Sequence, residues 1–158
     1  MLTGVDIAWA FPSTTVIQLG RGAQNLKYSP DGRLLAVARG TTVLLLDAKT
    51  LAQVGILFDQ GNIGPMDFSP DGRLLALGVG FGAFSLWDVQ STEQRMRFGE
   101  PLIELGRAEA VAFSFDGRLL ATLNDRTLEV RDLNTRQLVL SQGAYREVRT
   151  TFALLSTP

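Results

Sequence analysis

An eight-residue segment repeats along the chain and constrains its fold more than any other feature. Ser-Pro-Asp-Gly-Arg-Leu-Leu-Ala begins at Ser29 and again at Ser69. It returns from Ser114 to Ala121, with Phe115 where the proline stood. The aspartates of successive copies lie 40 and then 45 residues apart, a period long enough for a four-stranded unit. We therefore expect one supersecondary unit per repeat.

Each repeat is expected to form a strand, a tight turn and a second strand. Apolar residues alternate with polar ones before each serine, which predicts a strand with one inward face. These inward pairs are Leu26 and Tyr28, Met66 and Phe68, and Val111 and Phe113. The Pro-Asp-Gly segment is typical of a hairpin turn. A calcium loop is the alternative, but one carboxylate per turn cannot supply six to eight oxygen ligands.

Two further strands complete each unit. Near-continuous apolar runs, typical of strands buried on both faces, cover Leu34–Ala38, Leu74–Val79 and Leu119–Leu123. The third strands are expected to end at Asp47, Asp88 and Asp132, with inward positions at Val43 and Leu45, Phe84 and Leu86, and Leu128 and Val130. Outer strands are expected at about Ala52–Phe58, Pro101–Leu105 and Gln137–Ser141, with Gln90–Glu100 as an extended polar connection or a lengthened outer hairpin.

The repeats resemble WD repeats of the β-propeller superfamily. The resemblance rests on the Ser-Pro-Asp-Gly turn, the Leu-Leu-Ala strand and the third strand that ends in Trp87-Asp88. TolB-like and quinoprotein-like repeats share the turn segment. Only one unit carries the Trp-Asp pair, and the chain has no histidine. The histidine-centred hydrogen-bond network of many WD repeats therefore cannot form, and burial must contribute more.

The resemblance implies an all-β propeller segment of three complete four-stranded blades, with partial blades at both termini. The expected units are 1–22 (partial), 23–62, 63–106, 107–143 and 144–158 (the start of a further blade). Gly4–Ala10 and Thr14–Leu19 would be third and fourth strands, and Glu147–Leu154 a first strand, which makes fifteen strands. Propellers typically close with four to eight blades. We expect the uncovered apolar faces and strand edges to be covered by a second copy, by a separate polypeptide or by the rest of a longer product.

Glu129 and Arg131 interrupt the apolar pattern of the third unit. They occupy the positions of Leu44 and Leu46 in the first unit. One interpretation is a buried or rim ion pair. The other is that this face meets a polar neighbour or solvent, and so marks an interruption of the ring.

Composition excludes several classes of function. The formal charge is −1, from 15 basic and 16 acidic residues, so nucleic acid and anionic membranes are not expected partners. The absence of cysteine and histidine removes the common nucleophile systems and zinc ligands. No signal peptide or membrane span is recognisable, and a cytoplasmic protein is the default expectation.

No catalytic, cofactor or metal site is expected. The candidate carboxylates recur in every unit, as residues that serve the repeat would. The run Gly78–Gly82 looks like a phosphate loop, but it lacks the lysine and the following helix that such a loop requires, so a hairpin turn is expected.

The resemblance places a protein-binding face at the loops between second and third strands and between units. The candidate partner-binding residues are Arg21, Arg39, Asp59, Phe81, Arg107, Asp125 and Arg126, with Thr41, Asn62 and Asn124 beside them. We therefore expect a non-catalytic protein–protein interaction scaffold, acting as a homo-oligomer or as a subunit of a larger complex. The alternatives are a lectin-like ligand-binding propeller and the sensor portion of a larger signalling protein.

Overall fold

The computed structural model describes residues 22–98, 108–124 and 127–143, and within them the protein is all-β. Its strands form three antiparallel four-stranded sheets, each in sequential order. Sheet 1 contains β1 (Ala23–Tyr28), β2 (Leu34–Arg39), β3 (Thr42–Asp47) and β4 (Gln53–Phe58). Sheet 2 contains β5 (Ile63–Phe68), β6 (Leu74–Val79), β7 (Ala83–Asp88) and β8 (Glu93–Phe98), with the 3-10 turn η1 (Gly80–Gly82) between β6 and β7. Sheet 3 contains β9 (Ala108–Phe113), β10 (Leu119–Asn124), β11 (Thr127–Asp132) and β12 (Leu138–Gly143).

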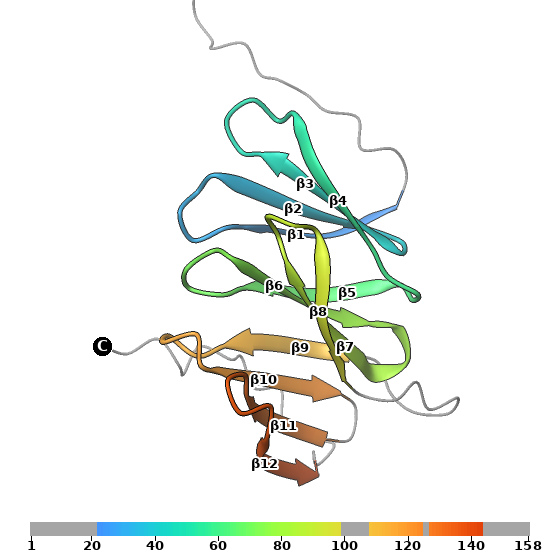
Figure 1. Cartoon of the computed structure of the whole chain (residues 1–158). Coiled ribbons are helices and arrows are strands. Elements are labelled where there is room, and N and C mark those ends of the chain that lie inside the picture. The colour runs from blue at the N-terminus through green and yellow to red at the C-terminus, as the bar shows by residue number, and fades with distance from the viewer. Residues whose placement is uncertain (1–21, 99–107, 125–126, 144–158) are drawn as a thin grey trace, which may run out of the picture.

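The three sheets follow one another as a stack, in the order of the chain (Figure 1). Their first strands are neighbours: β5 contacts β1 on one side and β9 on the other. The expected all-β class and the assignment of one four-stranded unit to each repeat are therefore confirmed. Over the described residues the stack is open, with sheets 1 and 3 at its two ends.

Two apolar layers hold the stack together. The layer between sheets 1 and 2 contains Ala36, Val43 and Leu45 from sheet 1 and Met66, Phe68, Leu75, Leu77 and Trp87 from sheet 2, among others. The layer between sheets 2 and 3 contains Ala76, Phe84 and Leu86 from sheet 2 and Val111, Phe113 and Leu120 from sheet 3. Sheet 2 is therefore buried on both faces, as its continuous apolar strands predicted.

The three Asp-Gly segments fold as identical hairpin turns, which confirms that prediction. In the first, Ser29 Oγ donates to Asp31 Oδ1 at 2.6 Å and accepts from the backbone N–H of Leu34 at 2.9 Å. The same carboxylate accepts from the Arg33 N–H at 3.0 Å. Gly32 has a φ of +69°, in the left-handed region that favours glycine. These side-chain bonds satisfy the backbone N–H groups of Arg33 and Leu34.

The outer strand of sheet 2 is β8, which begins at Glu93, within the segment Gln90–Glu100. Of the two interpretations of that segment, the lengthened outer hairpin agrees with the antiparallel pairing of β7 and β8, and the extended polar connection was wrong. The turn before β8 repeats that of sheet 1, because Asp88 Oδ1 accepts from the N–H groups of Gln90 and Ser91 as Asp47 Oδ1 does from those of Lys49 and Thr50. Turn geometry, rather than hydrophobicity, therefore sets the start of the outer strand.

The outer strands also keep a constant register. Residues seven positions apart are paired at Leu46 and Gln53, at Trp87 and Gln94, and at Arg131 and Leu138. The predicted segment Pro101–Leu105 lies outside the described residues. So do the terminal strands expected at Gly4–Ala10, Thr14–Leu19 and Glu147–Leu154.

Leu26 and Tyr28 do not have the inward environment expected of them. They are 60% and 55% exposed, whereas the equivalent Met66 and Phe68 of β5 are buried against sheet 1. The alternating pattern was read correctly as a strand. The exposure differs because β1 belongs to the first sheet of the described stack.

Candidate functional site

The loops between sheets gather at one end of the stack and are held together by backbone hydrogen bonds. The N–H of Asp59 donates to the Thr41 carbonyl at 2.9 Å, and that of Ile63 to the Gly40 carbonyl at 2.8 Å. The N–H of Gly80 donates to the Asn62 carbonyl at 2.8 Å. The connection between sheets 1 and 2 is thus tied to the β2–β3 turn of one sheet and the β6–β7 turn of the next. We call this end of the molecule the loop end.

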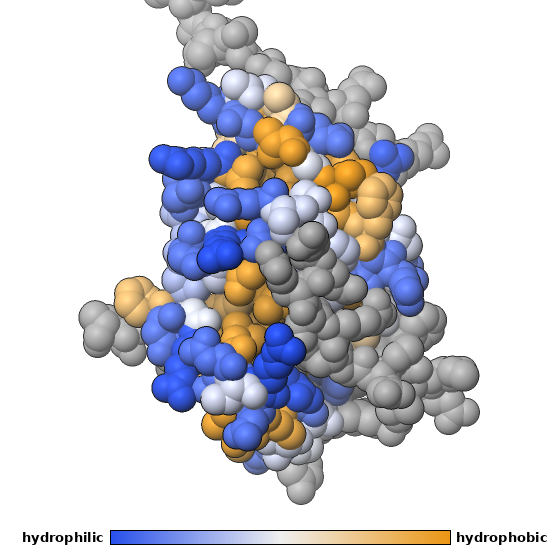
Figure 2. All heavy atoms as spheres, viewed as in Figure 1, coloured by the Kyte–Doolittle hydropathy of each residue, from blue (hydrophilic) through white to orange (hydrophobic). Residues whose placement is uncertain are grey.

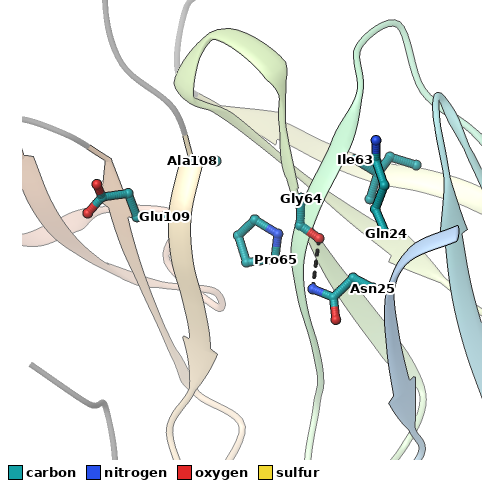
Figure 3. Close-up of a pocket in the computed structure, with 7 residues that line it drawn as sticks. All are labelled: Gln24, Asn25, Ile63, Gly64, Pro65, Ala108 and Glu109. Carbon is teal, nitrogen blue, oxygen red and sulfur yellow. Dashed lines mark hydrogen bonds between the residues drawn. The ribbon is translucent and has the colours of Figure 1, made fainter. Parts of the chain in front are cut away.

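A groove of about 500 Å³ opens at the loop end, between the first strands of the three sheets (Figure 3). Its lining residues are Gln24 and Asn25 of β1, Ile63, Gly64 and Pro65 of β5, and Ala108 and Glu109 of β9. The Asn25 amide donates to the Gly64 carbonyl at 3.0 Å and bridges β1 to β5. In Figure 3 the Glu109 carboxylate lies on the opposite side of β9 from Pro65. The groove therefore offers two amides and backbone groups, without a base paired to a nucleophile.

The candidate partner-binding residues are only partly described. Arg39 ends β2 at the loop end and is exposed. Asp59 lies in the connection between β4 and β5, at the same end. Phe81 lies in η1, and its side chain is outside the described part of the structure. Arg21, Arg107, Asp125 and Arg126 lie outside the described residues.

The Asp59 side chain takes part in a chain of hydrogen bonds within the protein. Its Oδ2 accepts from Ser85 Oγ at 2.7 Å, and Ser85 Oγ accepts in turn from Trp87 Nε1 at 3.0 Å. This chain ties β7 to the connection that precedes its sheet. Sequence reasoning missed it, because only the histidine-centred network was considered. The sequence signal that could have predicted it is Trp87, because the indole N–H of a buried tryptophan usually needs a hydrogen-bond acceptor.

The first strands are also linked across sheets by polar groups. Lys27 Nζ on β1 lies 3.1 Å from Asp67 Oδ1 on β5, and Asp67 Oδ2 accepts from the Phe113 N–H on β9 at 2.9 Å. One carboxylate therefore connects all three sheets along the inner edge of the stack. Asp67 is not repeated in the other units, and the sequence interpretation did not single it out.

The carboxylates of the three Asp-Gly turns, and that of Asp132, have lowered pKa values. Hydrogen bonds from the turn serines and then from the arginine N–H groups lower the pKa values of Asp31, Asp71 and Asp116. The pKa of Asp132 is also lowered, first by the Thr135 N–H and then by the Arg118 side chain, whose Nε lies 2.7 Å away. A general acid at neutral pH needs a raised carboxyl pKa, and these shifts have the opposite direction. Among the described residues no cluster of three or more acidic side chains has the arrangement of a metal site.

The outward side of sheet 1 is an apolar surface, here called the leading face. Register places Leu26 and Tyr28 beside Val37 and Leu35, on the side opposite the residues that contact sheet 2. Phe58 lies on the same side, paired with Thr42, and is 62% exposed. Val37 and Leu46, on the middle strands, are buried. The open part of the leading face is therefore the β1 edge together with Phe58.

The outward side of sheet 3 is a second apolar surface, the trailing face. Ala121 pairs with Val130, and Leu123 with Leu128, on the side of the sheet opposite Leu120, which contacts sheet 2. Leu140 pairs with Val130 from β12 and is 46% exposed. Figure 2 shows apolar side chains at this β12 end of the molecule.

Glu129 and Arg131 form the ion pair that one interpretation predicted, with Nη2 and Oε2 2.9 Å apart. Register pairs them with Thr122 and Leu120, so they lie on the side of sheet 3 that faces sheet 2. The pair therefore does not mark an open face, and the second interpretation was wrong in this respect.

The comparisons with known proteins give no information about the function. The chain matches no protein-family model, and no curated protein matches it. Within the described residues there is no helix with the length and apolarity needed to cross a membrane.

Proposed function

We propose that the three sheets are consecutive blades of a WD-repeat-like propeller segment and that the chain is a non-catalytic protein-interaction module. Its leading and trailing faces are covered by another polypeptide, which extends the stack. The observation that carries the proposal is that β1 exposes the repeat positions that β5 buries against its neighbouring sheet, and that Leu140 is exposed on the trailing face.

The exposure of equivalent residues supports this proposal. Met66 and Phe68 are 6% and 4% exposed, whereas Leu26 and Tyr28 at the same repeat positions are more than half exposed. Fully burying a large apolar side chain contributes about 1.5–3 kcal/mol. Exposed apolar patches rimmed by polar residues mark interaction sites. Burial of these exposed apolar side chains by a partner would therefore contribute favourably to the free energy of binding.

The charge balance favours a protein partner over nucleic acid or lipid. The chain is close to neutral, and the exposed groups on the leading face are a leucine and two aromatic residues. Aromatic residues are enriched at protein interfaces. The loop end, which carries the groove and the exposed Arg39, is a further surface for the same class of partner.

The full chain can be tested by light scattering after size-exclusion chromatography, together with bis-ANS fluorescence. The proposal expects either an assembly larger than the 17.2 kDa monomer or a folded monomer that binds bis-ANS at its open faces. In the second case, replacing Leu26 and Tyr28 by glutamate should lower the fluorescence. A folded monomer that does not bind bis-ANS would overturn the proposal.

A further inference from the structure

We propose that the polypeptide on the leading face is a second copy of this chain, whose trailing face packs there head to tail. The new junction repeats those between sheets 1 and 2 and between sheets 2 and 3. This inference rests on the proposed function, because it names the partner that covers the two faces.

The first support is that each internal junction joins one kind of surface to the other. Phe68 on β5 belongs to the same apolar cluster as Ala36 on β2, and Phe113 on β9 to the same cluster as Ala76 on β6. Ala36, Ala76 and Ala121 are the third residues of β2, β6 and β10. Tyr28 ends β1 as Phe68 ends β5 and Phe113 ends β9. The repeat therefore places Tyr28 of one copy against the trailing face of the next around Ala121, which is itself 6% exposed, with Leu140, 46% exposed, on the same side of the sheet.

The second support is a row of contacts between successive hairpin turns. A Cβ on Gly72 would lie 3.8 Å from Pro30 Cδ, and a Cβ on Gly117 would lie 3.4 Å from Pro70 Cδ. Each turn thus lies against the glycine of the next. The row is incomplete at both ends: Gly32 has no heavy atom within 4 Å of its Cβ position, and Phe115 is 78% exposed. In a head-to-tail contact, Phe115 of one copy would lie against Gly32 of another and so continue the row of turns.

The third support is the polarity of the surfaces. On the side that faces the preceding sheet, β7 carries Ser85 and Trp87, and β11 carries the Glu129–Arg131 ion pair. The equivalent positions of β3 are Leu44 and Leu46. The leading face is therefore more apolar at these positions than the matching side of sheet 3, which is buried within the chain. The leading face therefore suits an apolar partner surface. The trailing face is such a surface, since it carries Leu123, Leu128, Val130 and Leu140.

A head-to-tail contact uses two different surfaces, and an assembly that does not close leaves one of each free at its ends. The contact forms a closed ring if the rotation per copy closes, and an open fibre if it does not. Two chains contacting through the same face would instead form a symmetric dimer and stop. The two arrangements respond differently to substitutions on a single face.

The test uses two variants of the full chain. The leading variant carries Leu26→Glu and Tyr28→Glu, and the trailing variant carries Leu140→Glu. All three residues are exposed, so the fold should be retained, and circular dichroism with urea unfolding checks this. We expect wild type to assemble, and each variant alone to assemble at least about tenfold more weakly, because a charge replaces an apolar contact. Tyr28→Phe and Leu140→Met are the matched controls and should assemble like wild type.

Mixing the two variants is the decisive measurement. A head-to-tail contact predicts that the mixture forms a one-to-one pair through the trailing face of the leading variant and the leading face of the trailing variant. Native mass spectrometry with one variant isotopically labelled identifies that pair. If wild type assembles but the mixture does not pair, the head-to-tail contact is wrong and the proposed function stands. If wild type is a monomer, self-association is wrong, and its bis-ANS binding decides whether the proposed function stands.

Discussion

At the scale of single residues, the hydrogen bonds of the repeated turn explain why its serine and aspartate recur. Ser69 is buried, and its hydroxyl accepts from the Leu74 N–H while it donates to Asp71. Removing the hydroxyl would leave the Leu74 amide without its side-chain acceptor. The aspartate then fixes the next backbone N–H, that of Arg73. Both groups act on the turn backbone, which is a structural role.

The turn carboxylates make stability depend on pH in a defined direction. Hydrogen bonds from Ser69 and Arg73 hold the pKa of Asp71 below its ordinary value of 3.8. The stabilisation is complete above that value and is lost as the pH falls through the lower pKa of the folded state. We expect Asp71→Asn to be less stable than wild type at pH 7. The loss should be smaller than the full contribution of a charged hydrogen bond, about 1.5–3 kcal/mol, because the asparagine side chain still accepts hydrogen bonds.

Urea unfolding of both proteins at pH 7, 5, 4 and 3 measures this effect. The difference between wild type and Asp71→Asn should be constant from pH 7 to 5 and should narrow below about pH 4. An unchanged difference at pH 3 would show that the charge of Asp71 does not contribute.

Gly78 is a glycine because of close packing. A Cβ at this position would lie 2.6 Å from Pro65 Cγ and 2.8 Å from Ala108 Cβ, and neither neighbour can rotate away. We expect Gly78→Ala to destabilise the protein by about 1–3 kcal/mol through overpacking. Thermal unfolding measures the loss.

Gly64 supplies the matched control on the adjacent strand. Its Cβ position has only ordinary contacts, the nearest 3.6 Å away at the Ala108 carbonyl oxygen. Gly64→Ala should be neutral or slightly stabilising, because alanine restricts the unfolded chain more than glycine does. Equal losses for the two substitutions would contradict the packing explanation.

At the scale of elements, the hairpin turn tolerates a change in its sequence. The third turn has Phe115 in place of proline, yet Gly117 donates to the Ser114 carbonyl at 2.9 Å and has a φ of +70°, as in the other two turns. Serine, aspartate and glycine therefore suffice for the turn. The proline contributes by restricting the unfolded chain.

Restoring the proline is therefore expected to stabilise the third unit. Phe115→Pro should raise the free energy of unfolding by about 0.4–1 kcal/mol, because Pro30 and Pro70 occupy the same position in turns with the same hydrogen bonds. Urea unfolding measures the gain, and Phe115→Ala, which removes the exposed ring alone, should change stability by less than about 0.5 kcal/mol. A loss of stability in Phe115→Pro would mean that the third turn differs from the others.

At the scale of the whole molecule, sheet 2 is the part enclosed by the rest. Leu75 and Leu77 contact sheet 1, and Ala76 between them contacts sheet 3. Over the described residues, each end sheet shares one such layer with sheet 2. The polar contacts follow the same plan, since Asp67 of sheet 2 reaches Lys27 on one side and the Phe113 amide on the other.

Amide hydrogen exchange should reflect this enclosure. In the leading variant, which is expected to be unassembled, the amides of β6 and β7 should be the slowest to exchange and those of β1 and β12 the fastest, because local opening is easiest where little apolar surface is buried. Mass spectrometry of peptic fragments resolves the strands. Slow exchange in β1 equal to that in β6 would contradict the arrangement.

The sequence by itself determined the elements that depend on local chemistry. The Asp-Gly turns, the apolar strands after them and the third strands ending at Asp47, Asp88 and Asp132 were predicted because backbone conformation, side-chain alternation and turn residues are encoded within a few positions. Burial of sheet 2 on both faces followed from the continuous apolar runs.

The tertiary structure alone decided which residues meet across sheets. The Asp59–Ser85–Trp87 chain joins residues up to 28 positions apart. Leu26 and Phe68 both obey the same alternation, yet one is exposed and the other buried. Exposure depends on what lies opposite a strand in space, and a local pattern carries no record of that neighbour.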